Sequence, residues 1–526
     1  MTESEPLQTE QAGKTGSLRT RLLVLLILLP FLILAMVYLV TSLHLVFARN
    51  DTSYPEGASV YAFLTALRTG RLYSSPFDFP YNAQIYGPVF YLAGLVLAKV
   101  AHGDPMLTTE LYRLLSFLSF LGAAGIAGSL SWKLEMKGGW AAVSIVLGLA
   151  CVWTIPFSAC VRPDALSILL ILAALAVYQA AEGRSRLVFW AGVLGSLSWL
   201  TKQNTAPVLL ALTIDTLIAR RLRNTAALIA GSVPIPAIIL CALWLRREPF
   251  LANFLILRNL LFDWHTGLLM AINLLRTNQM AVIPISLATL GIGLNWRKEK
   301  YRAILLAGGL GCISSLAALG NIGGAANYFI LPWMLMILMV PAGLARVGEW
   351  TRLSIPVSVG LALLGGLLLM HQRNLLFQDV PADLDTRNVE NLKILSGWPY
   401  LEMRSRQPQL LDPFLYRVLS IQHLWSCAPI VEQVDGEEFD LILIAGSDGP
   451  GASEFQVKSI REVSGWGGDM LGPTVSHYRA LCEFPGSLAL VPRDRDSGVR
   501  DKDITRVFGQ PCRATVRTPQ LAPGMR

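Results

Sequence analysis

Long apolar runs, separated by short polar connectors, dominate the sequence. A helix that crosses the hydrocarbon core of a membrane needs about 20 mostly apolar residues. The only acid inside the runs is Asp215, near the end of its run. We therefore expect a mainly α-helical, polytopic transmembrane bundle. The runs that reach or approach the required length are residues 22–43, 86–101, 112–132, 140–160, 165–181, 187–201, 203–219, 225–245, 279–295, 303–320, 327–345 and 353–370.

The composition agrees with lipid as the main solvent of the fold. Of the 526 residues, 53% are hydrophobic and 15% are charged, whereas soluble domains carry roughly 25% charged residues. The net charge of +8 is not organised into basic runs interleaved with aromatic residues, so we do not expect a nucleic-acid partner. Excess Lys and Arg in short connectors instead predicts the orientation of membrane helices.

The basic connectors give an orientation. Those that contain Lys133, Arg184, Arg220, Arg297 and Arg346 are predicted to be cytoplasmic, together with an N-terminal tail at residues 1–20. The segments 162–164, 201–204, 246–278 and 321–327, and the C-terminus, then lie outside. A chain with its two ends on opposite sides crosses an odd number of times, so we expect about 11 spans. The run 86–101 is short and begins with Tyr-Gly-Pro, so we predict that it is a re-entrant or interfacial segment.

The chain is predicted to have two domains. Residues 21–370 form the transmembrane domain, with outer loops at 46–85 and at 246–278, the second suited to an amphipathic interfacial helix. Hydropathy falls after residue 370, and strand-like runs at 439–445 and 487–492 predict a small soluble α/β domain at 371–495. We expect the Arg-, Pro- and Asp-rich residues 496–526 to be disordered.

The seven cysteines show no spacing typical of a metal site. Cys427, Cys482 and Cys512 fall in the C-terminal part, on the side predicted to be oxidising, where they allow one disulfide without fixing its pairing. The sequence implies no metal or other cofactor, and metal dependence stays open.

The first outer loop contains two candidate catalytic acids, Asp51 and Glu56. A carboxylate at the edge of the lipid is partly desolvated, and such a group is suited to take a proton from a hydroxyl. The alternative is that both acids cap helices or solvate the interface.

Three further polar breaks lie on the predicted outer side. Arg162 and Asp164 begin one apolar run, where helix capping is the alternative role. Lys202 and Gln203 separate two short runs, and a Lys there can hold a phosphate or extend to the interface. The other candidates for substrate binding are Asn327, Tyr328, His265 and Tyr86, although an interfacial His is usually inert. These groups share one face of the membrane, which suits a substrate with a phosphate head and a lipid tail.

The order of these motifs resembles the GT-C superfamily of polyprenyl-phosphate-sugar-dependent glycosyltransferases, and within it the bacterial enzymes related to protein O-mannosyltransferases and to the lipid A aminoarabinose transferase. The resemblance covers roughly residues 20–370. Its motifs are Asp51 with Tyr54-Pro-Glu56-Gly57, Gly70-Arg-Leu-Tyr73, Tyr86-Gly-Pro88-Val-Phe90-Tyr91, Arg162-Pro-Asp164, Leu200-Thr-Lys202-Gln203 and Asn327-Tyr328-Phe-Ile-Leu-Pro332. The C-terminal part is similar to the outer domain of some members through Leu411-Asp412-Pro413-Phe414, Glu438-Phe-Asp440 and His477-Tyr478-Arg479.

The resemblance implies an inverting transfer of a sugar from a polyprenyl-phosphate donor to a hydroxyl of a glycan, lipid or protein, at the outer face of a bacterial inner membrane. The family's first-loop base maps onto Glu56 or Asp51, with Glu56 favoured because Gly57 and a helix follow it. Its second acid maps onto Asp164. Arg162 is then a phosphate or acceptor contact, and Lys202 and Tyr328 line the donor pocket. The chain departs from the family in separating the two first-loop acids and in replacing a Pro-Pro start at residues 87–88.

Two other functions are compatible with a polytopic chain. A transporter or flippase for a lipid-linked saccharide would favour an internal repeat and charges at mid-membrane, and the sequence shows no repeat. A non-catalytic scaffold for the soluble domain predicts that Asp51, Glu56, Asp164 and Lys202 tolerate substitution.

Overall fold

The structure is a computed structural model. It describes residues 6–48, 56–135, 138–150, 155–258, 262–321, 326–349, 390–396, 399–445, 473–474, 476–484, 487–508 and 513–514. Asp51 and the apolar run 353–370 lie outside the described residues.

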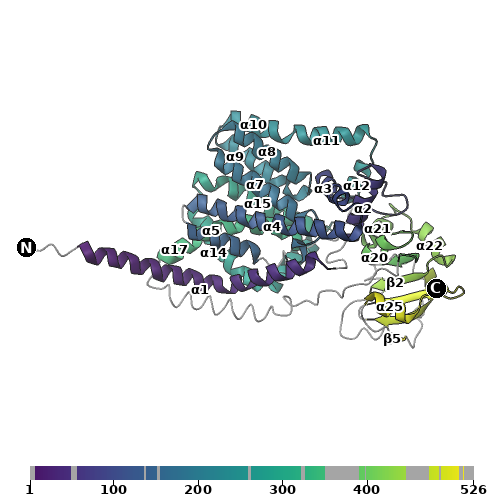
Figure 1. Ribbon diagram of the computed structural model, residues 1–526. Coiled ribbons are helices and arrows are strands. Elements are labelled where there is room, and N and C mark those ends of the chain that lie inside the picture. Colours follow the sequence, from purple (N-terminus) through teal and green to yellow (C-terminus); the bar gives the residue numbers. More distant parts are fainter. Residues whose placement is uncertain are drawn as a thin grey trace, which may run out of the picture.

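Helices make up nearly all of the described N-terminal part, and the larger ones run side by side as a bundle (Figure 1). The helices are α1 (Pro6–Val46), α2 (Glu56–Thr69), α3 (Pro88–Val100), α4 (Pro105–Glu135), α5 (Gly138–Leu149), α6 (Ile155–Ser158), α7 (Asp164–Ala181), α8 (Ser185–Trp199), η2 (Gln203–Thr205), α9 (Ala206–Ile218), α10 (Leu222–Ser232), α11 (Pro234–Leu245), α12 (Phe250–Arg258), α13 (Trp264–Thr277), η3 (Gln279–Ala281), α14 (Val282–Asn295), α15 (Glu299–Leu319), η4 (Ala326–Phe329), α16 (Ile330–Met336), η5 (Ile337–Met339) and α17 (Val340–Glu349).

Six helical segments of the described chain are long and apolar enough to cross a membrane, and a bent pair at 267–295 raises the number to seven. This is fewer than the expected number of spans, because helices such as α5, α8 and α9 contain only 12, 15 and 13 residues. Helix α3 has 13 residues, which at 1.5 Å per residue gives about 20 Å, less than the hydrocarbon core of about 30 Å. Helix α3 is thus too short to cross alone, and the re-entrant or interfacial placement of the run 86–101 stays a prediction.

Proline residues and changes of backbone conformation produce the breaks between consecutive helices. Pro88, Pro207 and Pro234 stand in the first turns of α3, α9 and α11, where the missing N–H group costs nothing. Helix α8 ends when Lys202 adopts an extended conformation, with φ −147° and ψ 126°. The polar break predicted at 201–204 is thus an interruption between two packed helices, the setting in which irregular backbone is tolerated at membrane depth.

The C-terminal part is an α/β domain around a five-stranded sheet of order β1-β2-β4-β3-β5. Strands β2 (Leu441–Ala445) and β4 (Ser487–Pro492) match the two predicted strand runs. The other elements are β1 (Ile394–Ser396), β3 (Tyr478–Phe484), β5 (Arg513–Ala514), α20 (Pro399–Arg404), α21 (Pro413–Ile421), α22 (Ala428–Asp435) and α25 (Asp501–Phe508). Only β1 and β2 pair in parallel; the remaining pairs are antiparallel.

The expectation of disorder throughout residues 496–526 was wrong for the described residues of that segment. Val499 and Ile504 are buried in the core of the domain, at 4% and 1% exposure, and β5 pairs with β3. A short amphipathic helix with few apolar residues carries little sequence signal, although burying those residues is enough to fix it on the sheet.

The C-terminal domain packs on the segment between α2 and α3, at the end of the bundle opposite to the start of α1 (Figure 1). Tyr81 forms a parallel β-bridge with Leu410, in which Tyr81 N–H donates to Gln409 O at 2.8 Å and Leu411 N–H donates to Tyr81 O at 3.0 Å. The Tyr416 hydroxyl donates to Pro76 O at 2.5 Å. These contacts fix the domain beside the loop that precedes α3.

Candidate active site

Asp164 lies in the first turn of α7, and its carboxylate contacts side chains from three segments of the chain. Its Oδ1 accepts hydrogen bonds from the Lys202 ammonium at 2.5 Å and from the Asn327 amide at 2.8 Å. Arg162 Nε lies 3.4 Å from Oδ2. Asp164, Lys202 and Asn327 are 2%, 4% and 2% exposed. Four residues singled out in three separate motifs thus form one buried polar cluster.

The ammonium of Lys202 lies at the centre of this cluster. Its Nζ is 4.6 Å from the centre of the Tyr328 ring, a distance typical of a cation–π contact. Lys202 reaches this position from the break between α8 and η2. Its N–H still donates to Ser198 O, but its backbone is extended, so the chain leaves the helix there. The site therefore holds a buried cation between a carboxylate and an aromatic face.

The segment that carries Tyr86 is docked against the same break. Gly87 N–H donates to Thr201 O at 3.3 Å, Val89 N–H donates to Leu200 O at 3.0 Å, and the Gln203 amide donates to Ile85 O at 3.2 Å. A Cβ at position 87 would collide with the carbonyl group of Leu200, so glycine is required for this close approach.

The Tyr86 side chain is 9% exposed and faces the cluster. Burial raises the pKa of its hydroxyl, while the charge of Arg162 lowers that pKa and the charge of Asp164 raises it. The Tyr73 hydroxyl donates to Tyr86 O at 2.9 Å, and the Glu248 carboxylate accepts the N–H group of Tyr73 at 3.0 Å. Tyr86 is thus held in place by Tyr73, whose backbone is bound in turn by Glu248.

Glu56 lies at the start of α2 and is fully buried. Its carboxylate forms a two-pronged ion pair with Arg113 of α4, at 3.1 Å and 2.7 Å. Its Oε1 also accepts the Val161 N–H at 2.6 Å. Both oxygens of this carboxylate are thus already engaged, by a guanidinium and by a backbone amide.

Two candidates remain. Asp51 lies outside the described residues. His265 is exposed at the start of α13, and its backbone N–H donates to Asp263 Oδ1 at 3.1 Å. Asp263 N–H in turn donates to Gly320 O at 2.8 Å, which ties this segment to the end of α15.

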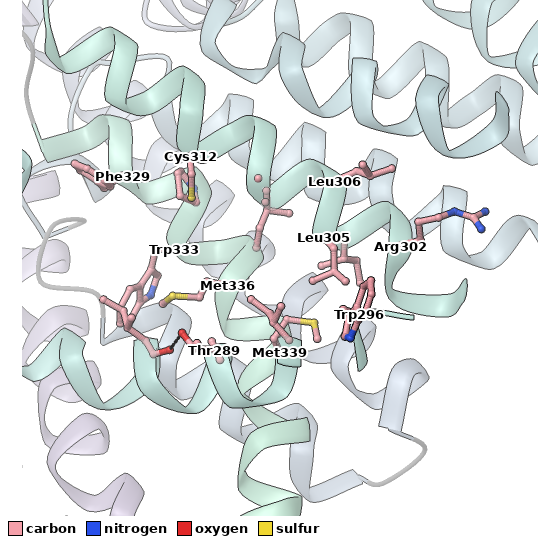
Figure 2. Close-up of a pocket in the computed structure, with 18 of the residues that line it drawn as sticks. Thr289, Trp296, Arg302, Leu305, Leu306, Cys312, Phe329, Trp333, Met336 and Met339 are labelled. Atoms are coloured by element: carbon pink, nitrogen blue, oxygen red, sulfur yellow. Dashed lines mark hydrogen bonds between the residues drawn. The ribbon is translucent and has the colours of Figure 1, made fainter. Parts of the chain in front are cut away.

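An apolar cavity of about 750 Å³ has Phe329, the residue after Tyr328, in its wall. Figure 2 shows Phe329 and Cys312 toward one end of the cavity, and Trp296 with Arg302 toward the other. Its walls come from α14, α15 and α16, and almost all of its lining is aliphatic, aromatic or methionine side chains. Such a cavity is suited to a hydrocarbon chain and not to a polar ligand.

Asp215, the acid noted inside an apolar run, lies in a separate ion pair. Its carboxylate accepts the Tyr178 hydroxyl at 2.6 Å and Arg302 Nε at 2.5 Å. Arg302 also lies 3.6 Å from Glu299. This pair joins α7, α9 and α15 near the predicted cytoplasmic ends of α9 and α15, and we assign it a structural role.

The sequence analysis missed Arg113. A lone Arg inside an apolar run, here 112–132, is itself a signal of function or of a buried partner. The partner could not be identified, because Glu56 is 57 residues away. No group of three or more His, Cys, Asp or Glu side chains suited to a metal ion occurs in the described part of the chain.

Comparison with known proteins shows which solved structures share the fold of this chain. No protein-family model matches the chain, and no curated protein is significantly similar to it. The structure is similar to ArnT from Cupriavidus metallidurans in the apo state, with a TM-score of 0.52, 13% identity and coverage of 87% of this chain and 97% of ArnT. For ArnT bound to undecaprenyl phosphate the values are 0.53, 12%, 89% and 99%. A looser likeness, with a TM-score of 0.49 and 11% identity, is to the archaeal oligosaccharyltransferase AglB from Archaeoglobus fulgidus, covering 88% of this chain and 74% of AglB. The chain therefore has the fold of ArnT, and the predicted resemblance is confirmed at this level of architecture.

Proposed function

We propose that the protein is a membrane glycosyltransferase that moves a sugar, with inversion, from a polyprenyl-phosphate donor to a hydroxyl acceptor at the outer face of a bacterial inner membrane. The observation that carries the proposal is the buried Lys202 ammonium, which lies between Asp164 and Tyr328. The residue after Tyr328, Phe329, lines an apolar cavity. A phosphate head and a hydrocarbon tail are the two parts of a ligand that this combination would accept.

The donor would place its phosphate beside Lys202 and Arg162 and its isoprenoid chain in the cavity. A Lys binds phosphate as a point charge and Arg binds it through a fork of N–H donors. The likeness to ArnT, of which one structure is bound to undecaprenyl phosphate, supports this choice of lipid. Asn327, Tyr86 and Gln203 would complete the wall of the donor site.

The described contacts favour Asp51 over Glu56 as the base. Glu56 is already bound by Arg113 and by Val161 N–H, whereas Asp51 precedes it by five residues in the same loop. In the proposed step the acceptor hydroxyl transfers its proton to the Asp51 carboxylate as its oxygen bonds to the anomeric carbon. The bond from that carbon to the phosphate oxygen breaks, and the polyprenyl phosphate leaves with the electron pair. Lys202 and Arg162 stabilise the charge that develops on the phosphate, while Asp164 orients both cations.

The orientation with the C-terminal domain outside, and an odd number of spans near 11, remain part of the proposal. Cys482 of β3 is disulfide-bonded, and disulfides persist mainly in oxidising compartments outside the cytoplasm. The C-terminal domain contacts the first outer loop, so it would cover the acceptor side. The acceptor class stays a glycan, lipid or protein, and His265 is a candidate contact because it is exposed near the end of α15.

The test is transfer by the full-length protein in membranes, with a panel of undecaprenyl-phosphate-linked sugars as donors and release of undecaprenyl phosphate as the readout. We expect release with one donor, its loss in Asp51→Asn, and a fall of at least about 100-fold in Lys202→Gln. Arg221→Gln is the matched control, because it removes a cation from an exposed ion pair with Glu299. Wild-type rates in both Asp51→Asn and Glu56→Gln would overturn the assignment of a first-loop base. Transport of a lipid-linked saccharide without release would overturn the glycosyltransferase.

A further inference from the structure

Arg113 of α4 is the most extensively bonded buried cation in the described part of the chain. Its side chain is fully buried. Nη1 donates to the carbonyl oxygens of Leu45 at 3.3 Å and Ala48 at 2.5 Å, at the end of α1. Nε and Nη2 donate to the two carboxylate oxygens of Glu56, at the start of α2. One guanidinium therefore binds the residues on both sides of the segment 49–55.

These contacts fix where that segment starts and ends. Ala48 precedes it and Glu56 follows it, and both are bound to the same side chain. The described residues on either side of the segment therefore meet at one point of the structure.

The same point is joined to the Arg162–Asp164 turn. Glu56 Oε1 accepts the N–H group of Val161, the residue before Arg162. One turn further along α4, the Ser116 hydroxyl donates to Cys160 O at 2.7 Å. Two α4 side chains one turn apart, Arg113 and Ser116, thus bind the end of α1, the start of α2 and the backbone that leads to Asp164.

Arginine is the side chain suited to this task. Its planar fork offers five N–H donors in fixed directions, whereas a Lys ammonium is a point charge on a flexible stem. Burying an ion pair often adds no stability over an apolar pair of the same size. The pair is therefore better explained by the geometry that it imposes than by the stability that it contributes.

We propose that Arg113 is a positioning residue, which with Glu56 holds the end of α1 at Ala48 and the start of α2 in a fixed register with the Val161–Asp164 turn. This inference rests on the proposed function for its catalytic consequence, but its structural part does not. The pair does not contact substrate; it acts through the segments that it joins.

The decisive variants are Arg113→Lys, which keeps the charge and loses the fork, and Glu56→Asp, which keeps the charge and shortens the reach. For each we expect kcat to fall about 100-fold while the KM for the donor stays within about threefold, since a small misplacement of reacting groups lowers the rate more than binding. The double variant should lose no more than either single variant, because both break one interaction. Arg221→Lys, in an exposed ion pair, is the matched control.

A second readout needs no activity. Hydrogen exchange of the full-length protein should rise in peptides covering residues 44–60 and 158–166 of Arg113→Lys, and stay unchanged in α15 and α16. Wild-type exchange in these peptides would overturn the proposal even if no donor supported transfer. Faster exchange with wild-type kcat would also overturn it, because the contact would then be structural only. If Arg113→Lys does not fold, both measurements are made on Glu56→Asp. A general loss of folding in both variants would contradict a positioning role.

Discussion

The Lys202 ammonium lies 2.5 Å from Oδ1 of Asp164, and both side chains are at most 5% exposed. Charges removed this far from water require close partners, since an unpaired buried charge costs several kcal/mol. The Asp164 carboxylate also receives the Asn327 amide and lies near Arg162. Asp164 is therefore the counter-ion of two cations, which under the proposed function bind the donor phosphate.

The first prediction concerns this pair. Lys202→Gln should lower kcat/KM for the polyprenyl-phosphate donor by about 100- to 1,000-fold, the effect of removing one preorganised donor from a developing negative charge. It should also weaken binding of undecaprenyl phosphate itself, measured by quenching of protein fluorescence. Lys133→Gln, at a 38% exposed side chain with a surface ion pair, is the control. Unchanged lipid binding in Lys202→Gln would contradict a phosphate contact.

The second prediction concerns the close approach at Gly87. Gly87→Ala should lower the unfolding midpoint and the transfer rate together, because its Cβ would collide with the Leu200 carbonyl and push Tyr86 away from the cluster. Overpacking of this kind costs about 1–3 kcal/mol. Gly125→Ala in α4, where a Cβ has nothing within 4 Å, should be neutral or stabilising. Equal thermal midpoints in the two variants would contradict the requirement for glycine.

The order of motifs along the chain predicted much of the site because each motif interrupts an apolar run. Arg162 with Asp164, Lys202 and Asn327 were noticed as polar groups at membrane edges, and the structure joins them in one cluster. Their distances could not be predicted, since they depend on how α7, α8 and η4 pack. Glu56 shows the limit clearly: nothing local to residues 54–57 reveals that Arg113 and Val161 engage its carboxylate.

The fold was predictable where burial produced long or strongly alternating patterns. The strands β2 and β4 were found from apolar runs, whereas β1 has only three residues and β5 only two. The number of spans stays a prediction, because an apolar run also arises from a short helix buried by its neighbours. Helix α5, with 12 residues, is such a case: it packs against α4 and α1.

The third prediction concerns pH and the outer domain. Glu402 is fully buried, and its carboxylate accepts N–H groups from Ser396, Gln409 and Leu410. Burial raises the pKa of Glu402 to about 8, even though these three donors lower it. The folded domain therefore binds the Glu402 proton more tightly than the unfolded chain, whose Glu pKa is about 4.3. This contribution to stability is complete below the unfolded pKa and is lost as pH rises through about 8.

We expect the unfolding midpoint of the outer domain, followed by scanning fluorimetry, to fall as pH rises from about 5 to about 9. Glu402→Gln should remove part of that slope, because the amide does not titrate. Glu432→Gln, an exposed acid on α22, should keep the wild-type slope. Parallel curves for wild type and Glu402→Gln would show that Glu402 is ionised in the folded domain throughout this range.

The last prediction tests the side of the membrane on which the outer domain lies. Cys482 is disulfide-bonded, whereas Cys427 and Cys241 are free, so the partner of Cys482 lies outside the described residues. We expect Cys512, which stands two residues before Ala514, the residue paired with Cys482 in the sheet. Alkylation of the denatured, unreduced protein should label Cys427 and Cys241 but leave Cys482 and Cys512 unlabelled until a reductant is added. Since a cytoplasmic domain is kept reduced, labelling of Cys482 without reductant in protein isolated from intact membranes would contradict an outer location, and with it the proposed outer-face transfer.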